Sequence, residues 1–259
     1  MANRFSERSR EPELIDGTDY AVAEFRDCLS DLRRINQLLG GQHALARHLF
    51  PMIEATGRQH IRLLDIGTGS ADLPRMVVEW ARQCGKRVDF VVVDLHPLAV
   101  REARNWVVDY PEILVVQADA FQLPFVEGGF DFVMASLFLH HFEDEAAARL
   151  LQGFSQVARD AFLINDLRRH PLAYYSIRCL TWLFTNNRLV RHDAAVSVLR
   201  GFQDADWQKI AGLAGLSLKV HRHFPFRYLI IGQAGGRDTE KPTTRRSGWG
   251  NDGREDGEE

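Results

Sequence analysis

Acidic and glycine residues near position 65 have the types and spacing of a ligand-binding turn. Residues 63–72 have the sequence LLDIGTGSAD and begin within an apolar run that predicts a buried strand. Gly67 and Gly69 predict a tight turn in which the backbone closely approaches a ligand. From Ala71, apolar residues recur at helical spacing. Strand, turn and helix form the first half of a nucleotide-binding βαβ unit, although an ordinary tight connection has the same pattern.

A second carboxylate, Asp94, closes the apolar run of residues 88–93. It lies 25 positions after Gly69, and an acidic residue about 20 positions beyond such a turn hydrogen-bonds a ribose diol. Asp94 is also placed to cap a helix ahead of Pro97, and the two roles are compatible. We therefore predict that Asp94 binds a ribose.

The nature of the nucleotide is indicated by Asp72, which stands where a pyrophosphate-binding turn has a third glycine. A carboxylate at the start of a helix favours the helix dipole but repels a pyrophosphate. S-adenosylmethionine carries a ribose, an adenine and a cationic sulfonium but no phosphate, so an acidic turn suits it. An NAD(P)-dependent oxidoreductase is the less favoured alternative.

Four motifs, in order and in spacing, resemble the class I S-adenosylmethionine-dependent methyltransferases. They are Asp65-x-Gly67-x-Gly69, Asp94, Gln117-Ala118-Asp119-Ala120, and the strand Phe130 to Ser136 followed by Leu139-His140-His141-Phe142. The resemblance covers residues 60–166 well and 20–233 more loosely. It implies an S-adenosylmethionine-dependent enzyme with an α/β, Rossmann-like doubly wound sheet of seven strands, in the order 3-2-1-4-5-7-6 with the last strand antiparallel.

The cofactor contacts follow from the same resemblance. Asp65 and the glycine turn are expected to hold the amino-acid part of the cofactor, Asp94 its ribose and Asp119 its adenine amino group. The full expected set is Asp65, Gly67, Thr68, Gly69, Asp94, Leu95, Asp119, Ala120 and Ser136. The alternative for Asp119 alone is a cap within its loop.

A pair of histidines is the candidate for catalysis. Methyl transfer from a sulfonium is an in-line displacement that mainly needs alignment and exclusion of water, but a phenolic acceptor also benefits from a base. His140 and His141 are adjacent ionisable residues expected at a strand end. We expect His141 to be the base, with His140 as the second candidate. Capping of the next helix and packing are the alternative roles. Because the three cysteines have no metal-ligand spacing, we expect no metal.

The aromatic segment 172–184 is the candidate wall for the acceptor, with Tyr174, Tyr175 and Arg178 as the expected contacts. Core packing is the alternative for most of its residues. We favour a small aromatic acceptor of the phenol, quinone or polyketide kind, with O-methylation. Residues 32–36 and 165–166 resemble methyltransferases of quinone and polyketide pathways, which indicates a role in secondary metabolism. A non-catalytic S-adenosylmethionine-binding partner subunit stays open.

The bulk properties restrict the partners and the location. A net charge of −3 over 259 residues provides no broad basic field for nucleic acid. No apolar run reaches the roughly 18 residues needed to span a bilayer. We expect a cytoplasmic protein with a small-molecule acceptor and without a nucleic-acid partner or membrane span, and a homodimer stays open.

The chain is predicted to divide into four parts. Residues 1–12 and 235–259 are polar and expected to be disordered, and 58–234 to form the cofactor-binding domain, with a substrate-side helical insertion at 167–202. For 13–57 the resemblance implies a helical cap over the cofactor cleft, and packing of these helices on the sheet is the alternative. The expected strands span 61–66, 88–94, 112–117, 130–136, 160–166, 216–223 and 226–232. The expected helices span 18–39, 42–52, 71–84, 97–108, 143–158, 172–184 and 204–212, with 188–201 partly helical. Alternation of this kind predicts a parallel sheet wound on both faces.

Overall fold

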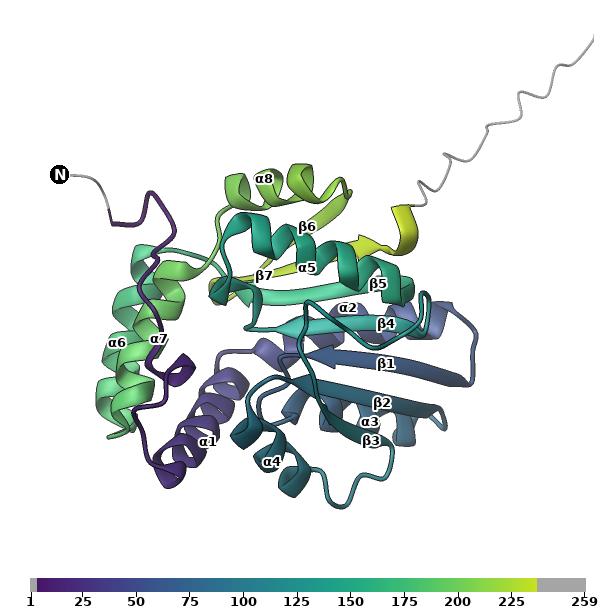
Figure 1. The fold of residues 1–259 in the computed structure, drawn as a ribbon, viewed down its shortest axis with the longest axis horizontal. Helices are drawn as coiled ribbons and strands as arrows, with labels where there is room; N and C mark the ends of the chain where they lie inside the picture. Colours follow the sequence, from purple (N-terminus) through teal and green to yellow (C-terminus); the bar gives the residue numbers. More distant parts are fainter. Residues whose placement is uncertain (1–3, 237–259) are drawn as a thin grey trace, which may run out of the picture.

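A seven-stranded sheet forms the centre of the computed structural model, which describes residues 4–236 (Figure 1). Its order is β3-β2-β1-β4-β5-β7-β6, and β7 runs antiparallel to both neighbours. The strands are β1 (His60–Ile66), β2 (Arg87–Asp94), β3 (Ile113–Gln117), β4 (Phe130–Ser136), β5 (Ala158–Leu167), β6 (Leu218–His223) and β7 (Arg227–Gln233). The predicted fold class, order and antiparallel strand are confirmed.

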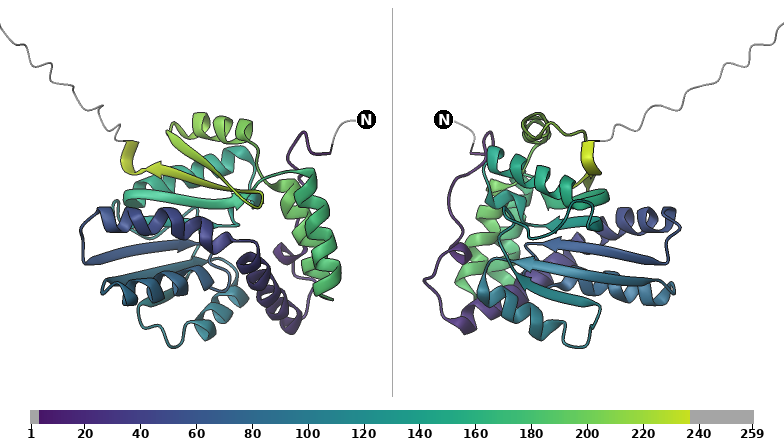
Figure 2. Two further views of the ribbon diagram at one scale, coloured as in Figure 1. Left: turned by 180° about the vertical axis from the view of Figure 1, so that it is seen from behind. Right: turned by 45° about the vertical axis from the view of Figure 1, so that its right-hand side comes forward.

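Helices cover both faces of this sheet. One face carries α2 (Gly41–Ala55), α3 (Asp72–Gln83) and α4 (Pro97–Trp106), and the other carries α5 (Asp144–Val157) and α8 (Asp204–Ala214) (Figure 2). Side chains alternate along β1, so Leu63 packs in the core with α2 and α3 while Leu64 packs in the core with α5 and α8. Burial on both faces explains why β1 is a nearly continuous apolar run.

Three further helices lie beyond the carboxyl ends of the parallel strands (Figure 1). They are α1 (Val22–Leu38), α6 (Pro171–Phe184) and α7 (Arg188–Arg200). Short 3-10 turns are η1 (Leu14–Asp16), η2 (Leu139–His141) and η3 (Ala234–Gly236). None of the helices within residues 4–236 is long and apolar enough to cross a membrane.

The expectation of disorder for residues 4–12 is wrong. Phe5 is buried, and its carbonyl accepts a hydrogen bond from Arg169 Nε at 3.0 Å. Arg8 donates to Asp144 at 2.8 Å and to the carbonyl of Arg200 at 2.9 Å. This N-terminal segment, residues 4–16, therefore packs across α6, α7 and η2, because its few apolar and basic side chains find partners far along the chain. Of the two predicted disordered ends, 1–3 and 237–259 lie outside the described residues.

The predicted cap at 13–57 separates into two parts. The α1 helix, together with η1, lies at the carboxyl edge and packs Cys28 against α7. The α2 helix instead lies on the sheet face, where Leu45, Leu49 and Ile53 are fully buried against β1, β5 and β7. We propose that only α1 and η1 act as the cap, since α2 is held by the core.

A histidine on α2 makes the stability of the fold depend on pH. Burial, with His221, His223 and Arg47 nearby, lowers the pKa of His48 from 6.5 to about 4. Between pH 6.5 and about 4 the unfolded chain protonates this histidine, whereas the folded chain keeps it neutral. The stability that His48 contributes is therefore complete above pH 6.5 and decreases as the pH falls. We expect urea midpoints to fall less steeply across this range for His48→Gln than for the unsubstituted chain. Equal slopes would contradict this assignment.

Candidate cofactor site

The turn after β1 has a geometry that requires glycine. Gly67 and Gly69 have φ of +68° and +55°, in the left-handed region. A β-carbon on Gly67 would also lie 2.2 Å from the ring of Phe138, which follows β4. The predicted glycine turn is present, and Phe138 lies directly against it.

Backbone and side-chain bonds fix the turn to β2 and to the end of β1. The amides of Gly67 and Thr68 donate to the carbonyl of Val93 on β2, at 2.9 and 3.1 Å. The Thr68 hydroxyl donates to Asp65 at 2.7 Å. Burial, together with the nearby charges of Asp72 and Asp94, raises the pKa of Asp65 to about 8 although the Thr68 bond opposes the shift. A cationic ligand would stabilise the ionised carboxylate here.

Asp94 links the first turn to the second. One carboxylate oxygen accepts from the amide of Gly69 and the other from the amide of His96, both at 2.9 Å. Burial raises the pKa of Asp94, and these two bonds partly offset the rise. The predicted helix cap by Asp94 is wrong, because the N-cap of α4 is His96, whose ring accepts from the amide of Leu98. Asp94 fixes the turn ahead of that cap, and its ribose contact stays a prediction.

The other predicted cofactor residues also lie at carboxyl ends of strands. Leu95 is 63% exposed after β2, and Asp119 and Ala120 are half-buried after β3. The carboxylate of Asp119 accepts from the amide of Phe121 at 2.9 Å, so a local turn fixes it in place. The bond matches the alternative role of Asp119 as a cap within its loop, and the adenine contacts of Asp119 and Leu95 stay predictions.

Ser136, at the end of β4, belongs to a buried polar cluster. Asn165 Nδ2 donates to the Ser136 hydroxyl at 2.9 Å and to the carbonyl of Gly41 at 3.1 Å. Arg227 donates to Asn36 at 2.8 Å, but its Nε and Nη1 have no partner among the described residues. Burial lowers the pKa of Arg227 to about 10 although Asp166 opposes the shift. The Ser136 hydroxyl is therefore hydrogen-bonded to Asn165, which in turn connects it to α2.

Sequence reasoning missed the wall that the cap supplies. Phe25 on α1 stacks on His96 with ring centroids 4.6 Å apart, and the Tyr20 hydroxyl lies 2.9 Å from His96 Nε2. Leu29 Cδ2 lies 4.0 Å from the position of a β-carbon on Gly69. The resemblance implied a cap over the cofactor cleft, but not that Tyr20, Phe25 and Leu29 are the side chains that face it.

The structure contradicts His140 as a catalytic base. It is 3% exposed, and its Nδ1 lies 2.7 Å from Asp166. Burial opposes the charged form, but Asp166 and Glu13 more than compensate and raise the pKa of His140 to about 10. A histidine that retains its proton at neutral pH cannot accept one. His141 is more accessible, and its Nδ1 lies 3.0 Å from Asp16.

The predicted acceptor residues on α6 lie elsewhere than expected. Tyr174 is buried in the core between α6 and α7, its ring against Phe5 and its hydroxyl bonded by Arg4 and Arg178. Tyr175 is 60% exposed, and Arg178 is also exposed. The prediction is wrong for Tyr174, because aromatic composition does not reveal which face of a helix is buried. Tyr175 lies edge-on to Phe5 and Arg178 donates to the Tyr174 hydroxyl, and their role toward an acceptor stays a prediction.

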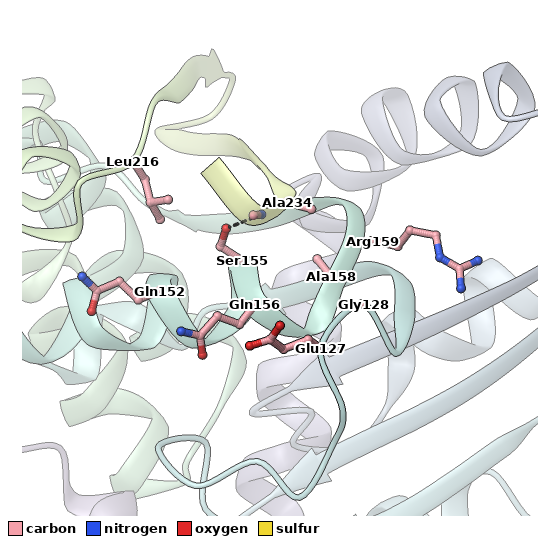
Figure 3. A pocket seen from close by; sticks show the side chains of 10 residues that line it. Glu127, Gly128, Gln152, Ser155, Gln156, Ala158, Arg159, Leu216 and Ala234 are labelled. Atoms are coloured by element: carbon pink, nitrogen blue, oxygen red, sulfur yellow. Dashed lines mark hydrogen bonds between the residues drawn. The ribbon is translucent and has the colours of Figure 1, made fainter. Parts of the chain in front are cut away.

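A cavity of about 790 Å³ is lined by residues of other elements (Figure 3). Its lining includes Glu127, Gln156 and Arg159, around the start of β5 and the end of α5. Ligands of open α/β sheets bind outside the carboxyl ends of the strands, and this cavity lies at the amino ends. We therefore propose that the cofactor binds at the edge formed by Gly67 and Asp94.

Comparison with known proteins agrees with this assignment. Residues 63–161 match a family model described as a methyltransferase domain. Residues 63–161 thus contain a methyltransferase domain. This match includes the strand ends that carry Asp65, Asp94, Asp119 and Ser136. It favours the methyltransferase over the oxidoreductase alternative.

Curated relatives of the methyltransferase domain include the ubiquinone/menaquinone biosynthesis C-methyltransferases UbiE. The chain is 31% identical to that of Laribacter hongkongensis over 123 residues, 47% of each chain. It is 30% identical to that of Stutzerimonas stutzeri over 149 residues, 55% of this chain and 54% of the relative. The chain thus spans about half the length of these curated relatives.

Solved structures share the fold of the methyltransferase domain. One is a magnesium protoporphyrin IX methyltransferase from Synechocystis with bound S-adenosylhomocysteine, with a TM-score of 0.52, 18% identity, and coverage of 76% of this chain and 84% of that one. Another is an S-adenosylmethionine-dependent methyltransferase from Aquifex aeolicus, with a TM-score of 0.55, 12% identity, and coverage of 83% and 99%. At these identities the likeness concerns the fold alone.

Proposed function

We propose that the protein transfers the methyl group of S-adenosylmethionine to a small aromatic acceptor of the phenol, quinone or polyketide kind. The observation that carries this proposal is the linked turn in which Asp94 binds the amide of Gly69 beside the buried Asp65. Such a site offers carboxylates to a ribose and to cationic groups but no cradle for a pyrophosphate.

Carbon is the favoured acceptor atom in this proposal. The relatives with about 30% identity are named as C-methyltransferases of ubiquinone and menaquinone biosynthesis. This support shifts the preference from the oxygen expected from sequence to a ring carbon. A carbon beside a phenolic hydroxyl becomes nucleophilic when the hydroxyl loses its proton, so both reactions begin with the same acceptor chemistry.

The chain contributes alignment and exclusion of water. The turn and Asp94 would fix the donor, while Phe138 and the aromatic pair Phe25 and His96 line the edge above it. Displacement at a methyl group is accelerated when donor and acceptor are held in line and dry. An apolar wall suits a planar acceptor, in agreement with the proposed class.

The test measures binding and turnover separately. We expect S-adenosylhomocysteine to raise the melting temperature and NAD to leave it unchanged. With methyl-labelled S-adenosylmethionine and a panel of phenols and quinols, we expect labelled product whose NMR spectrum shows a new C–CH3 group. An O–CH3 signal would return the preference to oxygen. Binding without turnover on the whole panel would support the non-catalytic subunit instead.

Cofactor binding should also protect α1 from proteolysis. Arg34 is 73% exposed on α1, so trypsin can reach it, but cleavage requires local unfolding of a helix that covers Gly69. A ligand present at 100 times its Kd should slow cleavage there by up to about 100-fold. Cleavage after Lys219 on β6 serves as the internal control and should keep its rate. Equal rates at Arg34 with and without S-adenosylhomocysteine would contradict the cap assignment.

A further inference from the structure

Two histidines and a glutamate converge where the N-terminal segment crosses the end of β4. His140 and His141 lie in η2, and Glu13 immediately precedes η1. One ligand atom from each of these three residues lies within 4.8 Å of the other two. The histidine rings stack with centroids 4.5 Å apart. We propose that Glu13, His140 and His141 bind a divalent transition-metal ion of the zinc class.

The spacing suits an ion better than direct hydrogen bonds. His140 Nε2 lies 3.4 Å from one oxygen of Glu13, and His141 Nε2 lies 3.9 Å from the other. A charge-assisted hydrogen bond is shorter, about 2.7–2.9 Å. Metal bonds of about 2.1 Å at tetrahedral angles separate neighbouring ligand atoms by about 3.4 Å. The first distance already has this value, and the second needs only a small rotation of His141.

Each histidine is oriented as a metal ligand usually is. Nδ1 of His140 lies 2.7 Å from Asp166, and Nδ1 of His141 lies 3.0 Å from Asp16. A carboxylate on one ring nitrogen fixes the tautomer and leaves the other nitrogen to the metal. Here both free nitrogens are Nε2, and both are directed at Glu13. Two histidines, each held by its own aspartate, thus direct their Nε2 atoms at the Glu13 carboxylate, which distinguishes this cluster from an ordinary ion pair.

The third ligand is also held in place. The Ser197 hydroxyl donates to Glu13 at 2.8 Å. The amides of Leu14 and Ile15 donate to Asp193 on α7, at 2.7 and 2.9 Å. Glu13 and His140 are 5% and 3% exposed, whereas His141 is 21% exposed at the rim. The ligands are therefore positioned before binding, and the route from solvent passes His141.

The ligand types select the class of ion. Imidazole suits zinc and related transition metals, whereas magnesium and calcium take oxygen ligands. Two histidines and one carboxylate leave one position open, as in catalytic rather than closed structural zinc sites. Ligation needs neutral imidazoles, so the ion takes the place of the proton on His140. A free-base role for His141 stays a prediction for the metal-free protein.

A bound ion would connect the cap to the cofactor edge. Glu13 comes from the segment ahead of α1, while both histidines follow β4 and its Ser136. His141 is also near enough to Asp94 to influence its pKa. The proposed site therefore joins the N-terminal segment to the turn that follows β4. The inference goes beyond the proposed function because metal binding requires neither cofactor nor acceptor.

The experiment measures zinc binding to the full chain, purified without a histidine tag and stripped with a chelator. Titration against a chromophoric competitor should give one zinc ion per chain. Glu13→Gln and His141→Ala should each weaken binding at least tenfold. Asp166→Asn removes an outer carboxylate and should weaken it by about 10–100-fold. Circular dichroism of each metal-free variant verifies that the fold is retained.

Matched variants separate this site from others. Glu143→Gln alters an exposed neighbouring glutamate, and His60→Gln alters a half-exposed histidine at the start of β1; both should bind zinc as the unsubstituted chain does. Binding that is no tighter in the unsubstituted chain than in Glu13→Gln would overturn the inference. So would a loss of zinc only in His48→Gln, whose side chain approaches His223. Because no cofactor is present, absence of methyl transfer leaves this result unaffected.

Discussion

Replacing Asp94 with alanine is expected to weaken S-adenosylhomocysteine binding at least tenfold. The unsubstituted chain should bind in the micromolar range, roughly −8 kcal/mol. Alanine removes the acceptor for the amides of Gly69 and His96 as well as the proposed ribose contact. The loss should therefore exceed about 1.4 kcal/mol, which corresponds to a factor of ten. Isothermal titration calorimetry provides the measurement.

Asp89 offers a matched control for this experiment. It lies on the same strand but is about half exposed and pairs with His60 and Arg87. Asp89→Ala should leave the affinity unchanged and the fold intact. An Asp94→Ala protein that binds S-adenosylhomocysteine as tightly as the Asp89→Ala protein would remove Asp94 from the site.

Replacing Arg169 with alanine should lower the free energy of unfolding by about 3 kcal/mol or more, the largest loss among the substitutions proposed for this protein. The side chain is 2% exposed, bonds the carbonyls of Phe5 and Gly201, and pairs with Asp206 at 3.0 Å. Truncation leaves these groups without their cation and opens a cavity, and removing one partner of a buried pair typically costs about 3–5 kcal/mol. Urea denaturation measures the difference.

The neighbouring arginine serves as the control. Arg168 is half-buried at the end of the sheet, and substitutions away from buried networks typically change stability by no more than about 0.5 kcal/mol. We expect Arg168→Ala to remain near this limit. If both variants lost the same stability, general disturbance after β5 would explain the result better than the Arg169 network.

Most of the fold was predictable because its signals are local. Apolar runs bounded by glycine or aspartate located β1 and β2, and periodicity located the helices that pack on the sheet. The positions of Gly67 and Asp94 at strand ends followed from the same pattern, since parallel strands bring their carboxyl ends to one edge. The cofactor edge was therefore accessible from sequence.

The remaining site depended on contacts between distant residues, which no local pattern encodes. Adjacent histidines indicated a strand end, but nothing near them pointed to Glu13, which is brought there by the N-terminal segment. Phe5 stands alone among polar residues, so its burial could not be inferred. The predicted acceptor contact of Tyr174 was wrong for the same reason, since the ring of Tyr174 packs against the distant Phe5. The α2 helix was assigned to the cap because its order in the chain does not reveal which surface it covers.

The long reach of the N-terminal segment determines when the donor edge can close during translation. Arg8 pairs with a residue 136 positions later and the amide of Leu14 with one 179 positions later. At about 5–20 residues per second, the ribosome needs roughly 10 to 40 s to supply the second partner. The segment emerges before α7 yet docks only after α7 has formed. A nascent chain that pauses before Asn187 would therefore display a finished β1 turn beneath an open cap, with Phe5 exposed to chaperones.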